Sequence, residues 1–117
     1  MIYEIPVTSD DTQEQSFDLF GYSLRLTLRY NPVGGIWQFD LFNLRTAAPI
    51  CLNAGLAVNA PALFAHRVPF VLVLADGSGL GINSLRQDEM GDRLRLFMID
   101  KEVWREAVRQ ATQADTR

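Results

Sequence analysis

The chain has little of three residue types on which many functional sites depend. Its 117 residues include one cysteine, one histidine and one lysine. A single cysteine excludes an intrachain disulfide, and one cysteine with one histidine cannot supply the usual ligands of a zinc site. Packing must therefore hold the fold together.

Positive charge is also scarce, because 11 lysine and arginine residues stand against 14 acidic ones, for a formal net charge of -3. Specific nucleic-acid binding is not expected, since phosphate affinity comes from clustered basic side chains. All basic residues but Lys101 are arginine. Arginine is favoured at protein interfaces because its planar group can pair and stack, so the composition indicates protein partners.

Long apolar runs are missing as well. No stretch of about 18 apolar residues is present, so we expect no membrane span. The first six residues lack the basic start and apolar core of a secretory signal, so we expect a protein made and used inside a cell or a particle. The hydrophobic fraction of 48% and the charged fraction of 21% are typical of one globular domain of this length.

The most regular pattern is a hairpin centred on the loop 31–35. Apolar and polar residues alternate from Tyr22 to Tyr30, the period of a strand with one buried face. A second strand, from Ile36 to Leu44, has apolar groups on both faces and should be covered on both sides for part of its length. Proline and glycines in the loop favour an antiparallel turn. The inward residues expected to determine the fold are Tyr22, Leu24, Leu26, Tyr30, Trp37, Phe39 and Leu41.

Shorter patterns predict the elements around this hairpin. Further strands are expected at Ile2–Val7 (an edge, because of Pro6), Gln15–Phe20, Ile50–Val58 (bent at Gly55), Val68–Ala75 and Arg93–Ile99. Connections are expected as a loop at Thr8–Glu14, a helical turn at Pro61–His66, a tight turn at Asp76–Gly79 leading to a return strand from Leu80, and a polar loop at Gln87–Asp92.

From Asp100 the apolar period becomes helical, with Asp100 as the N-cap and the polar end from Thr112 fraying. The apolar stripe comprises Val103, Trp104, Ala107, Val108 and Ala111. The stripe either closes the domain's own sheet, which we favour, or docks on another subunit. We therefore divide the chain into a β-rich part, 1–99, and a helix with its tail, 100–117, which belongs to the same single domain or forms an interface.

These patterns predict a mainly β protein: a small antiparallel β-barrel or β-sandwich with a central long hairpin and a C-terminal α-helix. No catalytic, cofactor-binding or metal-binding residue emerges, and we expect no enzyme. Cys51 lies in an apolar run typical of an inert thiol, and His66 is expected at a surface or in a turn. The glycines of 77–81 indicate a hairpin turn because no helix follows them, and the acidic runs 10–14 and 88–92 lack the spacing of a calcium loop.

Some outward strand positions carry more arginine and more apolar groups than solubility requires. Surplus apolar groups on a second face indicate either extra covering of the sheet or a subunit interface. The candidate interface residues are Arg25, Arg29, Phe97 and Trp104.

The hairpin and its surroundings also resemble a known family. The matching residues, in order, are Ile5-Pro6, Gln15-Ser16-Phe17, Leu19, Gly21-Tyr22, Leu24, Leu26, Arg29-Tyr30-Asn31, Trp37, Phe39-Asp40-Leu41, Pro49, Gly55 and Leu63. This order is similar to the small plug protein in the baseplates of contractile-tailed bacteriophages, of the cyanophage baseplate plug type. The similarity covers residues 1–99 and does not include the helix.

The resemblance implies a structural protein of the virion tail, a β-rich domain at the baseplate hub near the end of the tail tube, made in the host cytoplasm. It implies contacts with hub, tail tube and other baseplate proteins, three or six copies about the tail axis, and no cofactor. It also implies that Trp37, Phe39 and Leu41 pack on Tyr22, Leu24 and Leu26. The alternative is a small β-barrel module for a ligand or carbohydrate, with Trp37 and tyrosines lining a pocket.

Overall fold

The computed structural model describes residues 2–58, 60–64, 66–76 and 87–115, with side chains as far as residue 109. Its elements, in chain order, are β1 (Ile2–Ile5), β2 (Thr12–Leu19), β3 (Tyr22–Asn31), β4 (Ile36–Asn43), β5 (Ala48–Gly55), β6 (Phe70–Asp76), the 3-10 helix η1 (Gln87–Glu89), β7 (Leu94–Asp100) and α1 (Lys101–Asp115).

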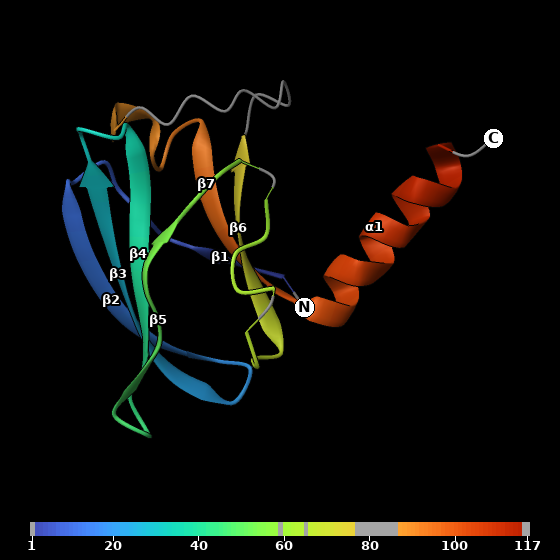
Figure 1. The fold of residues 1–117 in the computed structure, drawn as a ribbon, viewed down its shortest axis with the longest axis horizontal. Helices are drawn as coiled ribbons and strands as arrows, with labels where there is room; N and C mark the ends of the chain where they lie inside the picture. The colour runs from blue at the N-terminus through green and yellow to red at the C-terminus, as the bar shows by residue number, and fades with distance from the viewer. Residues whose placement is uncertain (1, 59, 65, 77–86, 116–117) are drawn as a thin grey trace.

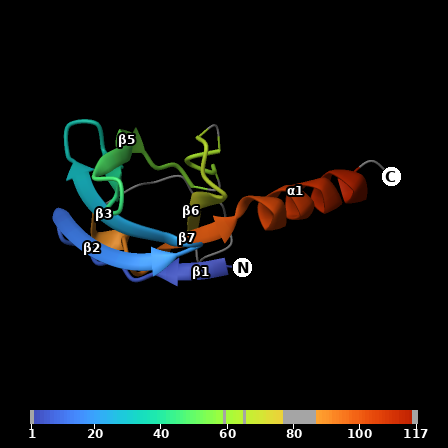
Figure 2. The same ribbon diagram turned by 90° about the horizontal axis from the view of Figure 1, so that it is seen from below.

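The strands form two antiparallel sheets, with the orders β1-β7-β6 and β2-β3-β4-β5. The two sheets pack around a shared core, and α1 begins at the end of β7 (Figures 1 and 2). The predicted mainly β class with a C-terminal helix is confirmed. Of the two predicted shapes, the two separate sheets correspond to the sandwich and not to a closed barrel. No helix among the described residues is long and apolar enough to cross a membrane.

The β3–β4 hairpin is present as predicted. Its antiparallel register places Tyr30 opposite Trp37, Leu28 opposite Phe39 and Leu26 opposite Leu41. The register places Leu41 opposite Leu26, as the resemblance implies, but it places Trp37 and Phe39 opposite Tyr30 and Leu28 and not opposite Tyr22 or Leu24. Residues of an antiparallel hairpin pair in reverse order, so the residues nearest the loop on each strand lie opposite one another.

The hairpin loop is held by one side chain. The Oδ1 of Asn31 accepts hydrogen bonds from the backbone N–H groups of Val33 and Gly34, at 3.1 and 3.2 Å. Gly35 adopts a φ of 65°, a conformation that glycine allows without steric cost. The local chemistry of the loop therefore sets the register of both central strands.

The core lies between the two sheets. Five of the seven predicted hairpin residues are at most 1% exposed, and Tyr22 and Tyr30 pack against them. The buried side chains of these five and of the facing sheet include Leu24, Leu26, Trp37, Phe39, Leu41, Phe70, Leu72, Leu74, Leu94, Leu96 and Met98. That the hairpin residues determine the fold stays a prediction, which mutation would test.

Several strand boundaries differ from those predicted, and two of them show why. β2 begins at Thr12, inside the expected loop, because Thr12 already pairs with Arg29 of β3. β5 ends at Gly55, and its register shifts lie on either side of its pairing with Leu41, away from the glycine. Cross-strand pairing thus extends or interrupts a strand where local composition predicts otherwise.

The helical turn predicted at 61–66 is wrong for the described residues. Ala62 exchanges two backbone hydrogen bonds with Leu72 of β6, at 2.8 and 3.1 Å. Leu63 follows with a φ of 71°, which a right-handed helix does not allow. The expected tight turn 76–79 and the return strand from 80 lie largely outside the described residues. The polar loop 87–92 is present as η1 followed by a turn.

Helix α1 begins as predicted, because the Oδ1 of Asp100 accepts a hydrogen bond from the backbone N–H of Glu102, at 2.8 Å. Figures 1 and 2 show the helix projecting beyond both sheets. Val103 is 39% and Val108 46% exposed, so the favoured interpretation, in which the stripe closes the chain's own sheet, is wrong for this part of the helix.

Candidate functional site

The outer face of the four-stranded sheet carries two of the candidate interface residues. Arg25, on β3, lies 3.8 Å from the carboxylate of Glu14 on β2, and its guanidinium stands 4.8 Å from the ring centre of Phe42 on β4. Phe42 is thereby partly covered by the chain itself. A role for Arg25 at an interface stays a prediction.

Arg29 forms the tightest polar cluster on that face. Its Nη1 and Nη2 donate to the two carboxylate oxygens of Asp40, at 2.6 and 3.0 Å, and Nη2 also donates to the Oδ1 of Asn53. The backbone N–H of Asn53 donates to Asp40 Oδ1, at 2.7 Å. The hydrogen bonds from Arg29 lower the pKa of Asp40, and the hydrogen bond with Asp40 raises the pKa of Arg29.

This cluster explains the irregular pairing of β5. Asn53 has a φ of 54°, and Asp40 lies at the register shift between Phe39 and Leu41. Asparagine tolerates the left-handed conformation better than most residues, and the carboxylate holds its backbone in place. Arg29 is therefore engaged within the chain, and its predicted part in an interface would have to use the remaining exposed portion of its side chain.

Phe97 lies on β7, between Glu4 of β1 and Val73 of β6 in the sheet register. It is half-buried, whereas its neighbour Arg95 is exposed and lies 3.5 Å from Glu4. The outward position of Phe97 was predicted, but its partial burial was not. A contact between Phe97 and a partner stays a prediction.

The base of α1 is fastened to the segment before β6. The backbone N–H of Lys101 donates to Pro69 O at 2.9 Å, and its Nζ donates to His66 O at 2.5 Å. Phe64 lies beside this anchor, with the guanidinium of Arg105 5.6 Å from its ring centre. The only lysine of the sequence is thus buried and structural.

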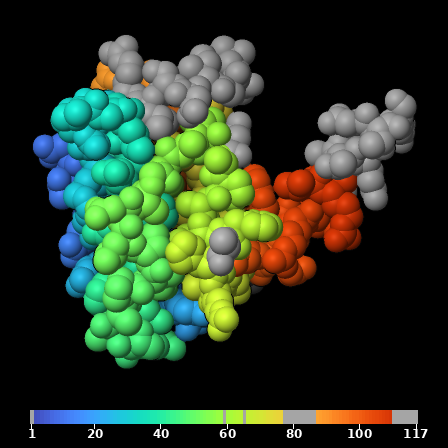
Figure 3. Space-filling view, in the orientation of Figure 1, coloured from blue at the N-terminus to red at the C-terminus, as the bar shows by residue number. Residues whose placement is uncertain are grey.

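Above this anchor, a surface hollow of about 210 Å³ separates the helix from the sandwich. Figure 3 shows the helix meeting the body at its base and standing clear of it beyond. The hollow is lined by Phe64, Trp104, Arg105, Val108 and Arg109. Trp104, the last of the candidate interface residues, therefore borders an apolar and basic surface, to which Phe64 contributes without having been predicted.

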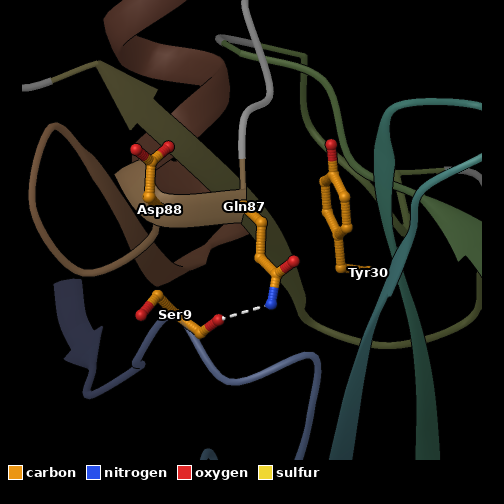
Figure 4. Close-up of a pocket in the computed structure, with 4 residues that line it drawn as sticks. All are labelled: Ser9, Tyr30, Gln87 and Asp88. Carbon is orange, nitrogen blue, oxygen red and sulfur yellow. Dashed lines mark hydrogen bonds between the residues drawn. The ribbon is translucent and has the colours of Figure 1, made fainter.

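A second and larger hollow, of about 380 Å³, has a polar lining of Ser9, Tyr30, Gln87 and Asp88 (Figure 4). The Nε2 of Gln87 donates to Ser9 O at 3.0 Å, which joins the loop after β1 to η1. Trp37 does not reach this surface, since it is fully buried and its ring meets that of Tyr30 at 5.3 Å. The alternative of a binding module lined by Trp37 is wrong on this point.

The single cysteine and the single histidine lie in different surroundings. Cys51 is buried in the core, and burial raises the pKa of its thiol. His66 is exposed in a turn closed by its N–H to Leu63 O, at 3.0 Å. Both positions agree with those predicted from the sequence. In the described part of the chain, no group of three or more His, Cys, Asp or Glu side chains is placed to hold a metal ion.

Comparison with protein families decides the identity of the sandwich. The family model described as the cyanophage baseplate Pam3 plug gp18 matches residues 2–101. The chain belongs to this baseplate plug family. The predicted resemblance is confirmed, and the family is a structural component of the phage tail baseplate. No curated protein matches the chain.

The range of the plug-family match coincides with the sandwich. It covers every strand and ends at Lys101, the first residue of α1. The hairpin residues, Arg25, Arg29 and Phe97 all lie inside the matched range, whereas Trp104 lies outside it. Membership of the plug family therefore characterises the two sheets, and α1 beyond Lys101 has to be understood from its own contacts.

Proposed function

We propose that the chain is a non-catalytic plug subunit at the distal end of the tail tube, where it contacts hub and tube proteins. Synthesis in the host cytoplasm and incorporation into the virion complete the proposal. The plug-family match supports a role in the baseplate. The observation that supports direct protein contacts is the edge strand β2.

β2 has the properties of an edge that accepts another strand. It is eight residues long, contains no proline, and pairs without interruption with β3. Natural proteins protect such edges with bulges, prolines or charged side chains. β2 has neither a bulge nor a proline, and it can add a strand from a neighbour whose side chains pair with its carboxylates. β1, the edge strand expected because of Pro6, is only four residues long, so it offers fewer main-chain hydrogen-bonding groups to a partner strand.

The outward side chains of β2 add a charge preference. Glu14 and Asp18 are exposed, and the loop before the strand adds Asp10 and Asp11. An acidic surface beside a channel that conducts DNA would not retain phosphate, and it favours a protein partner with basic side chains along its strand. Copies would be related by the rotational symmetry of the tail, with three or six expected about its axis.

An electron-microscopy reconstruction of the intact tail tip tests this proposal. Density for the two sheets on the tail axis, with the β2 edge against a hub or tube subunit, is the expected result. A tail tip fully accounted for by other chains would exclude the proposed position.

A variant tests the contact itself. Glu14→Lys combined with Asp18→Lys should reduce incorporation into baseplates, because it reverses the charge of the β2 edge while leaving both side chains at the surface. Asp92→Lys, at an exposed position outside β2, is the control. Equal incorporation of both variants would show that β2 is not the contact.

A further inference from the structure

Every second residue of β2 has its main-chain groups directed away from β3. The backbone N–H of Tyr30 donates to Asp11 O at 2.9 Å, directly before the strand begins. Opposed residues of an antiparallel pair alternate between hydrogen-bonded and non-hydrogen-bonded pairs, so this bond sets the pattern along the uninterrupted register of β2 and β3. The residues whose N–H and C=O groups face outward, which we call the open residues, are Thr12, Glu14, Ser16 and Asp18.

The open residues also carry the exposed side chains of the strand, whereas the residues between them are partly buried. Two of those between them bind the loop after β1. The Nε2 of Gln13 donates to Thr8 O at 2.7 Å, and the Nε2 of Gln15 donates to Pro6 O at 2.6 Å. The loop is thus held by side chains on the inner side of β2. In the described part of the chain, no main-chain hydrogen bond joins another segment to an open residue.

The side chains of the open residues define the chemistry of a strand that fits them. Glu14 and Asp18 stand four residues apart on the exposed side, with the small Ser16 between them. The ion pair of Glu14 with Arg25, at 3.8 Å, is exposed and therefore screened by water. Opposite charges directly across a strand pair are favourable, and like charges are unfavourable. The complementary strand therefore carries basic residues at two positions four apart.

We propose that β2 accepts an antiparallel strand of a partner protein, with basic side chains opposite Glu14 and Asp18 and a small side chain opposite Ser16. Antiparallel pairing fits because each basic residue then lies directly level with a carboxylate and its own N–H and C=O groups bond to the open residue there. The inference rests on the proposed contact at β2. It deepens that proposal by specifying the direction of the partner strand and the spacing of its charges.

Amide hydrogen exchange of the full chain, followed by NMR, measures the open edge directly. In the free chain, the N–H groups of the open residues should exchange at least about tenfold faster than those of Gln15 and Phe17, which face β3. The probe is a cyclic hairpin peptide whose outer strand reads Lys-Val-Thr-Val-Lys, with the lysine and threonine N–H groups facing outward. Cyclisation lowers the entropy lost on binding. At up to about 1 mM, the peptide should slow the exchange of the open residues.

Two changes in the peptide test the direction of the strand. Methylation of both lysine backbone nitrogens should weaken binding about tenfold or more, because these N–H groups bond to β2. Replacement of both lysines by glutamate should weaken it as strongly at low salt. Sensitivity to both changes identifies an antiparallel pair. In a parallel pair, the residues that bond to the open residues are offset by one position from those that share their face.

Variants of the chain separate main-chain pairing from charge. Ser16→Pro removes one outward N–H, which an edge strand tolerates, and should weaken binding of the lysine peptide about tenfold or more. Ser16→Ala is the matched control and should bind as the wild type does. Glu14→Lys combined with Asp18→Lys should bind the glutamate peptide better than the lysine peptide. Melting curves of each variant verify that the sandwich remains folded.

Two results would overturn the inference. One is unchanged exchange of the open residues at about 1 mM peptide. The other is equal binding by Ser16→Pro and Ser16→Ala, which would mean that only side chains make the contact. The tail-tip reconstruction keeps the inference separate from the proposed function. A tail tip without this chain would refute its position but not the pairing, whereas a helix or loop of the partner seated on β2 would refute the pairing but not the position.

Discussion

Arginine occupies comparable positions on the sandwich and on α1 but has different surroundings. On the outer sheet face, Arg29 is joined to Asp40 and Asn53 from two other strands, so its charge stabilises the chain's own fold. On α1, Arg105 and Arg109 pair along the helix and border an apolar hollow. On the sheet face arginine therefore links three strands of the fold, whereas on α1 its ion pairs stay within one exposed helix.

The largest expected effect comes from the centre of the sandwich. Trp37→Ala should lower the free energy of unfolding by about 3–5 kcal/mol, because it removes a fully buried ring. Denaturant unfolding measures it. Trp37→Phe should cost clearly less, since the indole Nε1 has no hydrogen-bond partner among the described residues. Equal losses for the two variants would contradict the assignment of the ring's packing as the main contribution.

The next largest effect on stability is expected at the ion cluster of Arg93, Asp76 and Glu89. Arg93 lies 3.1 Å from Asp76 and 2.6 Å from Glu89, and the Asp76 carboxylate is only 1% exposed. Arg93→Ala should lower Tm distinctly, because it removes the cation beside a buried carboxylate. Arg95→Ala, whose partner Glu4 is exposed, is the control. Similar melting curves for both variants would show that burial of the pair is unimportant.

The Arg29–Asp40 pair should contribute only about 1 kcal/mol to the free energy of unfolding, because both side chains are partly exposed. A double-mutant cycle with Arg29→Ala and Asp40→Ala measures it. Because the folded-state pKa of Asp40 is lowered, its contribution is present above the unfolded pKa and is lost as pH falls through the folded value. The difference in stability between wild type and Asp40→Asn should therefore shrink in acid, and a constant difference would contradict this.

The smallest effect on stability is expected on the helix. Trp104→Ala should change the unfolding free energy of the monomer by about 0.5 kcal/mol or less, because the side chain lies outside the core. Thermal unfolding measures it. A loss comparable to that of Trp37→Ala would mean that α1 belongs to the core, and the contrast between sandwich and helix would disappear.

Much of the sandwich was predictable because its strands have one buried face. The alternation of Leu24, Leu26 and Leu28 identified β3, and Leu94, Leu96 and Met98 did the same for β7. The start of β2 was missed, since Thr12 and Gln13 are polar and are held by pairing with β3. The segment at 61–66 was also missed, because its bridge to Leu72 outweighs its helical composition.

The candidate interface was predictable only in part. Trp104 was identified from helical spacing, but spacing alone cannot tell whether an apolar stripe meets the chain's own sheet or a partner. The position of Phe64 beside α1 could not be predicted from the sequence, because it depends on where the first turn of the helix packs. The contact of Arg29 with Asn53 was equally hidden, because the two residues are distant in the sequence and meet only across β4, which lies between their strands.

The sequence by itself determined the mainly β class, the central hairpin, the cap of α1 and the resemblance to the baseplate plug family. These follow from local periodicity, turn chemistry and ordered motifs, which are properties of neighbouring residues. Only the tertiary structure decided that the strands form two sheets, that Trp37 fills the core and that α1 projects with an exposed apolar face. Those outcomes depend on contacts between distant segments, which periodicity cannot specify.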